Sequence, residues 1–206
     1  MTTSGRTGPA EILTSLPLAD EAADARLRAR LAAAAEREGI LDVAYRLIET
    51  PVGVLLLAAT ERGLVRVAYD REDHDAVLAA LAGAVSPRIL RAPARLETVS
   101  RQLEEYFAGR RHAFDVPLDF RLAHGFRRSV LAHLPAIGYG RTESYAQVAA
   151  AAGSPRAVRA AGTACATNPL PVIVPCHRVI RSDGSPGAYV GGPDAKRSLL
   201  GLEAAA

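Results

Sequence analysis

The chain has 206 residues, of which 49% are hydrophobic and 23% are charged, and this suits a globular protein of one large or two small domains. No stretch approaches the ~20 consecutive apolar residues of a membrane helix, and the first residues lack the apolar core of a secretory signal. We therefore exclude a membrane protein and expect the cytoplasm. The net charge of +3 conceals a difference between the halves, because residues 121–206 sum to +6 and the first 120 residues to −3. A basic half is a mild indication of a polyanionic partner.

Residues 1–40 are expected to be an N-terminal extension, partly helical, because Gly, Ser, Thr and Pro give way to an Ala-rich helical pattern that ends at Gly39. Residues 41–120 predict a small α/β domain. Three strand-like runs, at 41–50, 52–60 and 64–70, predict an antiparallel meander, and helical patterns follow at 74–85 and 92–111. The segment 112–120 is either an edge strand or an extended linker.

Residues 121–206 form the third predicted region, which is mostly helical. One helix is expected over residues 125–140. Ser144, with Gln147 three residues later, forms a capping box that begins a second helix, and Gly153 is the glycine that ends it.

Ser154 followed by Pro155 predicts the start of a third helix, since serine caps helices and proline favours their first position. The two short helices and their Gly-Ser turn predict a helix-turn-helix. The third helix carries Arg156 and Arg159, and its other positions are almost all small. Such a helix suits either tight packing against a neighbouring helix or close approach to a DNA groove, and composition does not decide between them.

Cys176 lies between Pro175 and His177, at the end of an aliphatic run that predicts a buried strand. Cationic neighbours favour the thiolate form of a cysteine, so Cys176 is a candidate nucleophile, whereas Cys165 among alanines and threonines is expected to be structural. In a strand, Cys176 and His177 would point to opposite faces. Either the backbone turns sharply at Cys176 or a water relays the proton.

A histidine that acts as base also needs an orienting carboxylate, and the nearby candidates are Asp183, Asp194 and Glu203. The spacing does not choose among them. No metal site is expected, because Cys and His residues are not paired at ligand spacing, and no phosphate-binding glycine loop is present. We expect no cofactor.

The segment SYAQVAAAAGSPRAVRAAGTACATNPLPVIVPCHRVIRSDGSPGAYVGG closely resembles the active-site region of O6-alkylguanine-DNA alkyltransferases, also called methylated-DNA–protein-cysteine methyltransferases. PCHRV, the upstream RA-x-G…NP helix and the downstream Y-x-GG segment carry the resemblance. It implies an α+β fold: a small ribonuclease-H-like α/β domain, then a mostly helical, winged-helix-like DNA-binding domain with the active site. It does not cover residues 1–40.

The resemblance implies DNA repair by irreversible, single-turnover transfer of the alkyl group from O6-alkylguanine in duplex DNA to Cys176, with O4-alkylthymine left open as a substrate. His177 would be a water-linked base oriented by Glu203, and Tyr145 would help rotate the nucleotide and donate a proton to the departing guanine. Arg159 would fill the place of the base flipped from the minor groove. Asn168 would be the hinge between recognition helix and active-site loop.

The implied DNA-binding residues are Arg159, Asn168, Ala157, Ala160, Thr163, Arg156, Arg127, Arg128 and Tyr145. The implied base pocket consists of Tyr145, Val174, Pro175, Tyr189, Val190 and Gly191. Val190 departs from relatives with a serine at this position, which leaves tolerance for bulky alkyl groups open. The chain has no cysteine before Cys165, so a thiolate zinc site near the N-terminus is excluded.

Two alternatives compete with the alkyltransferase. An alkyltransferase-like protein that flips and flags lesions without transfer would lack the acceptor cysteine, whereas Cys176 is present. A Cys/His hydrolase would need a distant histidine such as His124 or His133. We expect double-stranded DNA carrying O6-alkylguanine as the partner and a monomeric protein, with cooperative assembly on DNA left open.

Overall fold

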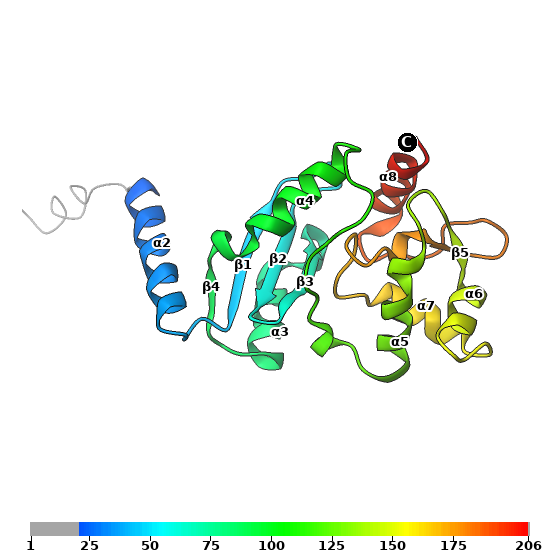
Figure 1. Ribbon diagram of the computed structural model, residues 1–206, viewed down its shortest axis with the longest axis horizontal. Helices are drawn as coiled ribbons and strands as arrows, with labels where there is room; N and C mark the ends of the chain where they lie inside the picture. The colour runs from blue at the N-terminus through cyan, green and yellow to red at the C-terminus, as the bar shows by residue number, and fades with distance from the viewer. Residues whose placement is uncertain (1–20, 206) are drawn as a thin grey trace, which may run out of the picture.

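The first half of the chain folds into a four-stranded sheet with one helix on each face (Figure 1). The computed structural model describes residues 21–205. The strands are β1 (Val43–Ile48), β2 (Leu55–Thr60), β3 (Gly63–Tyr69) and β4 (Ile89–Arg91), and the helices are α3 (His74–Ala84) and α4 (Glu97–Phe107). The spatial order of the strands is β3-β2-β1-β4. The predicted antiparallel meander is confirmed, while β4, which pairs parallel with β1 over three residues, was not predicted.

Strand β2 shows why the sheet lies between two helices, because all six of its residues are buried. Leu55 and Leu57 point to the core that includes α4, while Leu56 and Ala58 point to the smaller core that includes α3. Side chains alternate between the two faces of a strand, so a continuous apolar run needs cover on both. We call this unit the N-terminal domain.

Segment 112–120 is mostly an extended linker, with one β-bridge between Leu64 and Leu118. Gly63 permits this approach, since it has a φ of +132° and a Cβ there would lie 2.3 Å from the Pro117 carbonyl oxygen. The linker leads from the sheet to the helical second half.

Helix α2 (Glu21–Arg37) confirms the helical part of the predicted extension. It ends two residues before Gly39, whose φ is +67°. Ala32 and Ala35 pack against Leu41 and Ala44 beside the edge of the sheet. The rest of the predicted extension, residues 1–20, lies outside the described residues.

The second half contains the helices α5 (Gly125–His133), α6 (Tyr145–Ala151), α7 (Val158–Ala166) and α8 (Gly192–Ala204), with β5 (Glu143–Ser144) and β6 (Val179–Ile180) pairing in parallel. We call it the C-terminal domain. No helix in residues 21–205 is long and apolar enough to cross a membrane. The capping box of Ser144 and Gln147 is confirmed, and Gly153 ends α6 with a φ of +83°.

Two predicted helix boundaries are wrong. The helix expected over 125–140 ends at His133, because Pro135 lies in the following turn (η4, Leu134–Ala136). Ser154 does not cap α7: residues 154–157 form a turn closed by a hydrogen bond from the Ala157 N–H to the Ser154 carbonyl, and α7 begins at Val158. Arg156 therefore precedes α7.

The two domains share one apolar core, which contains Leu57 and Tyr106 from the first and Leu131, Val174 and Leu199 from the second. This common core holds the PCHRV segment and α8 against the N-terminal domain.

Candidate active site

Cys176 lies in a turn rather than in the predicted strand. Residues 170–175 form turns in which Val172 has a φ of +71°, and Cys176 begins a 3-10 helix (η5, Cys176–Arg178). The residue is 1% exposed. A run of buried aliphatic residues does not distinguish a strand from a buried turn, which is why the prediction failed. The sharp turn at the cysteine, one of the two arrangements expected from the sequence, is present.

Asn168 ties the end of α7 to this turn. Its Nδ2 donates to the Val174 carbonyl at 2.8 Å and to the Cys176 Sγ at 3.1 Å, while its Oδ1 accepts from the Leu170 N–H at 2.9 Å. The side chain is fully buried. This geometry suits a hinge that connects α7 with the cysteine turn.

The surroundings keep Cys176 protonated at neutral pH. Burial raises the pKa of its thiol to about 11, although the hydrogen bond from Asn168 and the charge of Lys196 favour the thiolate. Since the thiolate is the nucleophilic form, reaction at this sulfur requires a base. Cys165 is also buried, with a pKa raised to about 12 by burial.

His177 is the residue that can supply the base. It is fully buried, and its Nε2 lies 2.8 Å from the Glu203 Oε1. Burial lowers the pKa of His177, so the imidazole is neutral. A carboxylate accepts but does not donate, which places the proton on Nε2 and a lone pair on Nδ1. Among the described protein groups, none makes a hydrogen bond to this Nδ1.

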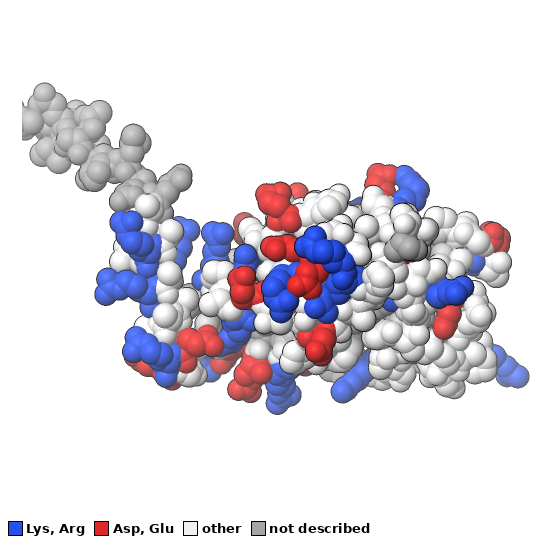
Figure 2. Space-filling view, turned by 45° about the horizontal axis from the view of Figure 1, so that its top comes forward, with Lys and Arg blue, Asp and Glu red and all other residues white. Residues whose placement is uncertain are grey.

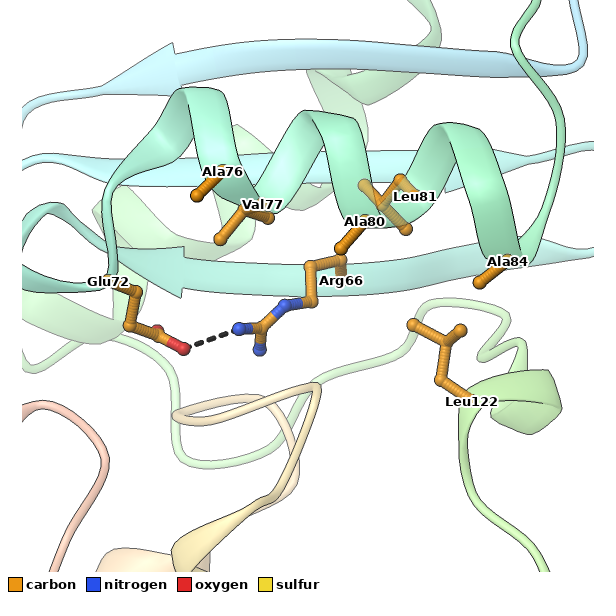
Figure 3. Close-up of a pocket in the computed structure, with 8 residues that line it drawn as sticks. All are labelled: Arg66, Glu72, Ala76, Val77, Ala80, Leu81, Ala84 and Leu122. Atoms are coloured by element: carbon orange, nitrogen blue, oxygen red, sulfur yellow. Dashed lines mark hydrogen bonds and ion pairs between the residues drawn. The ribbon is translucent and has the colours of Figure 1, made fainter.

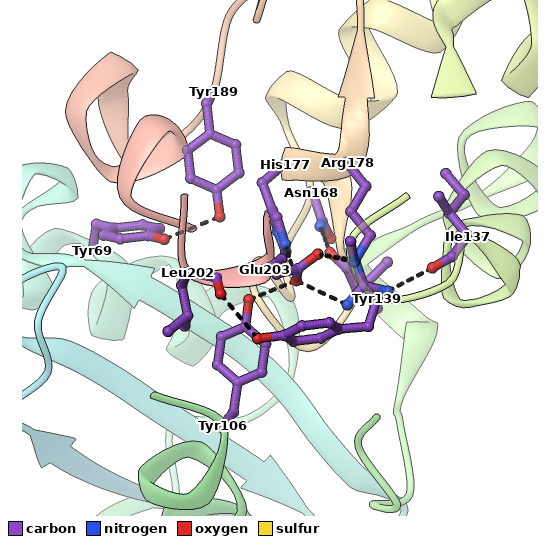
Figure 4. A network of polar contacts seen from close by, with 12 residues as sticks. Tyr69, Tyr106, Ile137, Tyr139, Asn168, His177, Arg178, Tyr189, Leu202 and Glu203 are labelled. Atoms are coloured by element: carbon purple, nitrogen blue, oxygen red, sulfur yellow. Dashed lines mark hydrogen bonds and ion pairs between the residues drawn. The ribbon is translucent and has the colours of Figure 1, made fainter. Parts of the chain in front are cut away.

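Glu203 is the acceptor at the centre of the network (Figure 4). Besides His177, its carboxylate accepts from Arg178 Nε and Nη2, both at 2.9 Å, from the Tyr106 hydroxyl at 2.7 Å and from the Gly140 N–H at 3.2 Å. Burial opposes ionisation, but the hydrogen bonds from His177, Arg178 and Tyr106 lower the pKa of Glu203 to about 2. The carboxylate is therefore charged throughout the physiological range.

The structure selects Glu203 from the three acids that the sequence offered. The Asp183 carboxylate accepts hydrogen bonds from the backbone N–H and the hydroxyl of Ser185, and Asp194 forms an ion pair with Arg197. Sequence reasoning missed Tyr106, although the spacing of Val99, Leu103 and Tyr106 marks one helix face.

It also missed Lys196, which is fully buried and donates to the Val179 carbonyl at 2.6 Å. A buried lysine is rare enough that only the fold could have revealed it.

Tyr145 begins α6, beside the cysteine turn and the loop before α8. Its ring faces Gly162 and Gly187, and a Cβ on Gly187 would lie 2.7 Å from the Tyr145 hydroxyl oxygen. Burial raises the pKa of Tyr145 to about 12, so its hydroxyl is a neutral donor.

The other predicted pocket residues lie around this turn. Val174 and Pro175 are buried and Val190 is half-buried. Tyr189 is buried, with its hydroxyl oxygen 3.0 Å from that of Tyr69 in the N-terminal domain. Gly191 lies against the same tyrosine, because a Cβ there would be 2.5 Å from the Tyr69 ring.

The predicted DNA-binding side chains separate into two groups. Arg128, Arg156 and Arg159 are exposed, and within the described chain no side-chain hydrogen bond or ion pair involves them. Ala160 and Thr163 are exposed on α7 as well, while Ala157 is half-buried at its start. Small exposed side chains on α7 thus occur together with three arginines that have no partner among the described residues.

Arg127, unlike the other three arginines, has partners within the protein. Its guanidinium donates to the Leu122 carbonyl at 3.2 Å and to the Thr167 carbonyl, and burial lowers its pKa. The half-buried side chain thus joins α5 to the end of α7, and its part in phosphate binding stays a prediction. These contacts follow from its position on α5, which sequence spacing did not reveal.

Neither the charges on the face that Figure 2 shows nor the cavity between α3 and β3 indicates a second reactive centre. On the face seen in Figure 2, acidic and basic groups alternate over the N-terminal domain and few charges lie on the C-terminal domain. A cavity of about 270 Å³ between α3 and β3 has apolar walls, and its polar end is the ion pair of Arg66 and Glu72 (Figure 3). None of the predicted site residues lines it. Across residues 21–205, no group of three or more His, Cys, Asp or Glu could hold a metal ion.

Both domains match known protein families. Residues 43–120 match "6-O-methylguanine DNA methyltransferase, ribonuclease-like domain", and residues 125–205 match "6-O-methylguanine DNA methyltransferase, DNA binding domain". These matches confirm the predicted fold class.

Curated relatives carry a consistent name. The chain is 39% identical over 159 residues to a methylated-DNA–protein-cysteine methyltransferase of Methanosarcina barkeri, covering 77% of this chain and 96% of the relative. It is 38% identical over 160 residues to a constitutive one of Bacillus subtilis, covering 77% and 94%. It is also 38% identical to the bifunctional transcriptional activator/DNA repair enzyme Ada of Escherichia coli, covering 80% of this chain and 46% of that one.

Solved structures agree. The O6-methylguanine methyltransferase of Mycobacterium tuberculosis is 36% identical with a TM-score of 0.68, covering 79% of this chain and 93% of that one. A structure of Mycobacterium tuberculosis OGT in complex with DNA matches with a TM-score of 0.66 at the same identity and coverage.

Proposed function

The chain belongs to the methylated-DNA–protein-cysteine methyltransferases, DNA-repair enzymes that transfer an alkyl group to a cysteine, and we propose from this membership that Cys176 is the acceptor and O6-alkylguanine in duplex DNA the substrate. The observation that carries the proposal is the turn at Cys176, in which a buried thiol is followed directly by a neutral histidine paired with an ionised Glu203. Cys165 has no such neighbours.

The proton relay begins at the thiol. Its proton passes through a bridging water to Nδ1 of His177. The Nε2–H of His177 keeps its hydrogen bond to the Glu203 carboxylate, which stabilises the imidazolium that forms. Sγ then forms a bond to the alkyl carbon while the bond between that carbon and O6 breaks. The electron pair of the broken bond goes to guanine O6.

The leaving guanine needs a proton, and we assign its delivery to Tyr145, as the family resemblance implies. The raised pKa keeps the Tyr145 hydroxyl protonated, and its phenolate recovers a proton from the imidazolium through solvent. The thiol proton thus ends on guanine, and the protein keeps a thioether. Regeneration of the thiol would need a nucleophile to displace the thiolate from the alkyl carbon of this unreactive thioether, so each molecule is expected to act once.

Access to a base inside a duplex requires flipping. Arg159, with its exposed guanidinium and the small Ala160 and Thr163 beside it, suits insertion in place of the flipped base from the minor groove. The free arginines Arg128 and Arg156 suit phosphate contacts that carry no sequence information.

The test is the mass of the protein and of its peptides after incubation with a duplex that carries one O6-methylguanine. We expect a stoichiometric gain of one methyl group on Cys176. Cys176→Ala should take up none and still bind DNA, whereas the matched variant Cys165→Ala should be methylated normally. Tight lesion binding without methylation would support the flagging alternative, and a methyl group on Cys165 would refute the assignment.

A further inference from the structure

Tyr106 brings the N-terminal domain into the reactive network. Its hydroxyl donates to Glu203 Oε1 at 2.7 Å, and the same oxygen lies 2.8 Å from His177 Nε2 (Figure 4). Arg178 Nη2 donates to this oxygen as well, at 2.9 Å, so three donors share it. Tyr106 is the one from the N-terminal domain, and His177 is the proposed base.

The hydroxyl is held firmly in this position. Tyr106 lies on the buried face of α4 and is fully buried. Its ring contacts those of Phe107, Phe114 and Tyr139, with centroids 5.3, 5.2 and 6.1 Å away. Burial and the charge of Glu203 raise its pKa, so the hydroxyl remains a neutral donor. Because packing of the ring already fixes the side chain, the hydrogen bond to Glu203 costs little additional side-chain conformational entropy.

We propose that Tyr106 is a positioning residue of the alkyl transfer: from the N-terminal domain it holds Glu203 Oε1 and so sets how strongly the carboxylate binds the Nε2–H of His177. The inference rests on the proposed function of His177 as base. It gives the ribonuclease-like domain a direct part in the chemistry of the other domain.

The direction of the effect follows from the sharing of Oε1. Without the hydroxyl, the carboxylate has one donor fewer and holds the His177 Nε2–H more strongly, which stabilises the imidazolium. The pKa of His177 then rises, and less of the neutral base is present at a given pH. The charged and titratable groups that face His177 and Glu203 are Arg178 of η5, Lys196 of α8, Tyr189 of the preceding loop, and Tyr106 and Tyr139. All but Tyr106 stay in place when the hydroxyl is removed.

The experiment compares Tyr106→Phe with the unaltered full chain. Single-turnover alkyl transfer is followed from pH 5 to 9, with the O6-methylguanine duplex and with a free O6-alkylguanine base that needs no flipping. We expect the acid limb of the pH–rate profile to move up by about half a pH unit, because one hydrogen bond to the carboxylate is lost. Below the midpoint this is a loss of about threefold in rate, with little change on the plateau.

Tyr139→Phe is the matched control. Its hydroxyl donates to the Leu202 carbonyl at 3.3 Å and not to Glu203, so the midpoint should stay where it is. If Tyr106→Phe does not fold, Tyr106→Met removes the same hydroxyl, and NMR titration of the His177 ring reads the same shift.

An unchanged midpoint in the Tyr106 variant would overturn the inference, and so would an equal shift in both tyrosine variants, which would indicate general loosening of the interface. Absence of transfer by the unaltered protein would instead refute the proposed function. The two failures are therefore distinguishable.

Discussion

Replacing Glu203 with glutamine tests whether the buried network stabilises the fold as well as the base. The carboxylate side chain is 1% exposed and that of Arg178 is 7% exposed. In Glu203→Gln, the amide presents N–H groups where five donors now converge on two oxygens, and the guanidinium loses its counter-charge. We expect a lower free energy of unfolding and slower alkyl transfer.

Two arguments give the expected loss of unfolding free energy in Glu203→Gln. The fall in the pKa of Glu203 from 4.5 to about 2 corresponds to about 3 kcal/mol of stability at neutral pH, at about 1.4 kcal/mol per pKa unit. Removal of one partner of a buried ion pair typically costs about 3–5 kcal/mol. The two agree on about 3 kcal/mol.

The assay is urea unfolding at pH 7.5, with the free energy in water obtained by linear extrapolation. The matched control is Glu143→Gln, since Glu143 pairs with His133 at 2.8 Å but both side chains are partly exposed, and its loss should stay below about 1 kcal/mol. Transfer by Glu203→Gln should be at least about tenfold slower, because the tautomer of His177 is no longer imposed. Equal losses in the two variants, or a loss below about 1 kcal/mol in Glu203→Gln, would refute the reasoning.

Four further outcomes follow from the structure. Arg159→Ala should leave methyl uptake from a free O6-alkylguanine base unchanged and slow uptake from duplex DNA, and equal slowing of both would argue against insertion. Arg128→Ala should reduce the salt dependence of DNA binding by about one phosphate contact, measured as the slope of log affinity against log salt. The carboxyl of Glu203 should titrate near pH 2 by NMR, so its stabilisation is complete above about pH 4.5 and is lost as the pH falls toward 2, and a midpoint near 4.5 would contradict the network. Gly191→Ala should cost about 1–3 kcal/mol, because its Cβ would lie 2.5 Å from the Tyr69 ring, and Tyr69→Leu should restore part of that loss in urea unfolding.

The sequence by itself was sufficient for features that depend on local order. The strands of the meander follow from short apolar runs bounded by turn residues such as Gly53 and Gly63. The start of α6 follows from the capping box of Ser144 and Gln147, whose groups lie within one turn. The chemical candidacy of Cys176 followed from its neighbours, and the PCHRV motif identified the family.

Only the tertiary structure decided which distant groups meet. Glu203 lies 26 residues after His177, and neither it nor Tyr106, 97 residues earlier than Glu203, can be assigned by spacing. The resemblance named Glu203, but the fold selected it over Asp183 and Asp194. Packing of one domain on the other brings these groups together, and packing depends on contacts that no local pattern encodes.

The same reason explains the errors. An apolar run such as residues 170–175 can be buried either in a strand or in a turn. Here it forms a turn, in which Val172 has a positive φ. In the same way, the hydrogen bond of Arg127 to the Thr167 carbonyl depends on its place on α5 and not on its neighbours in the sequence. Local sequence determines which conformations and chemistries a segment can adopt, while burial and partners, which set pKa values and exposure, are properties of the assembled fold.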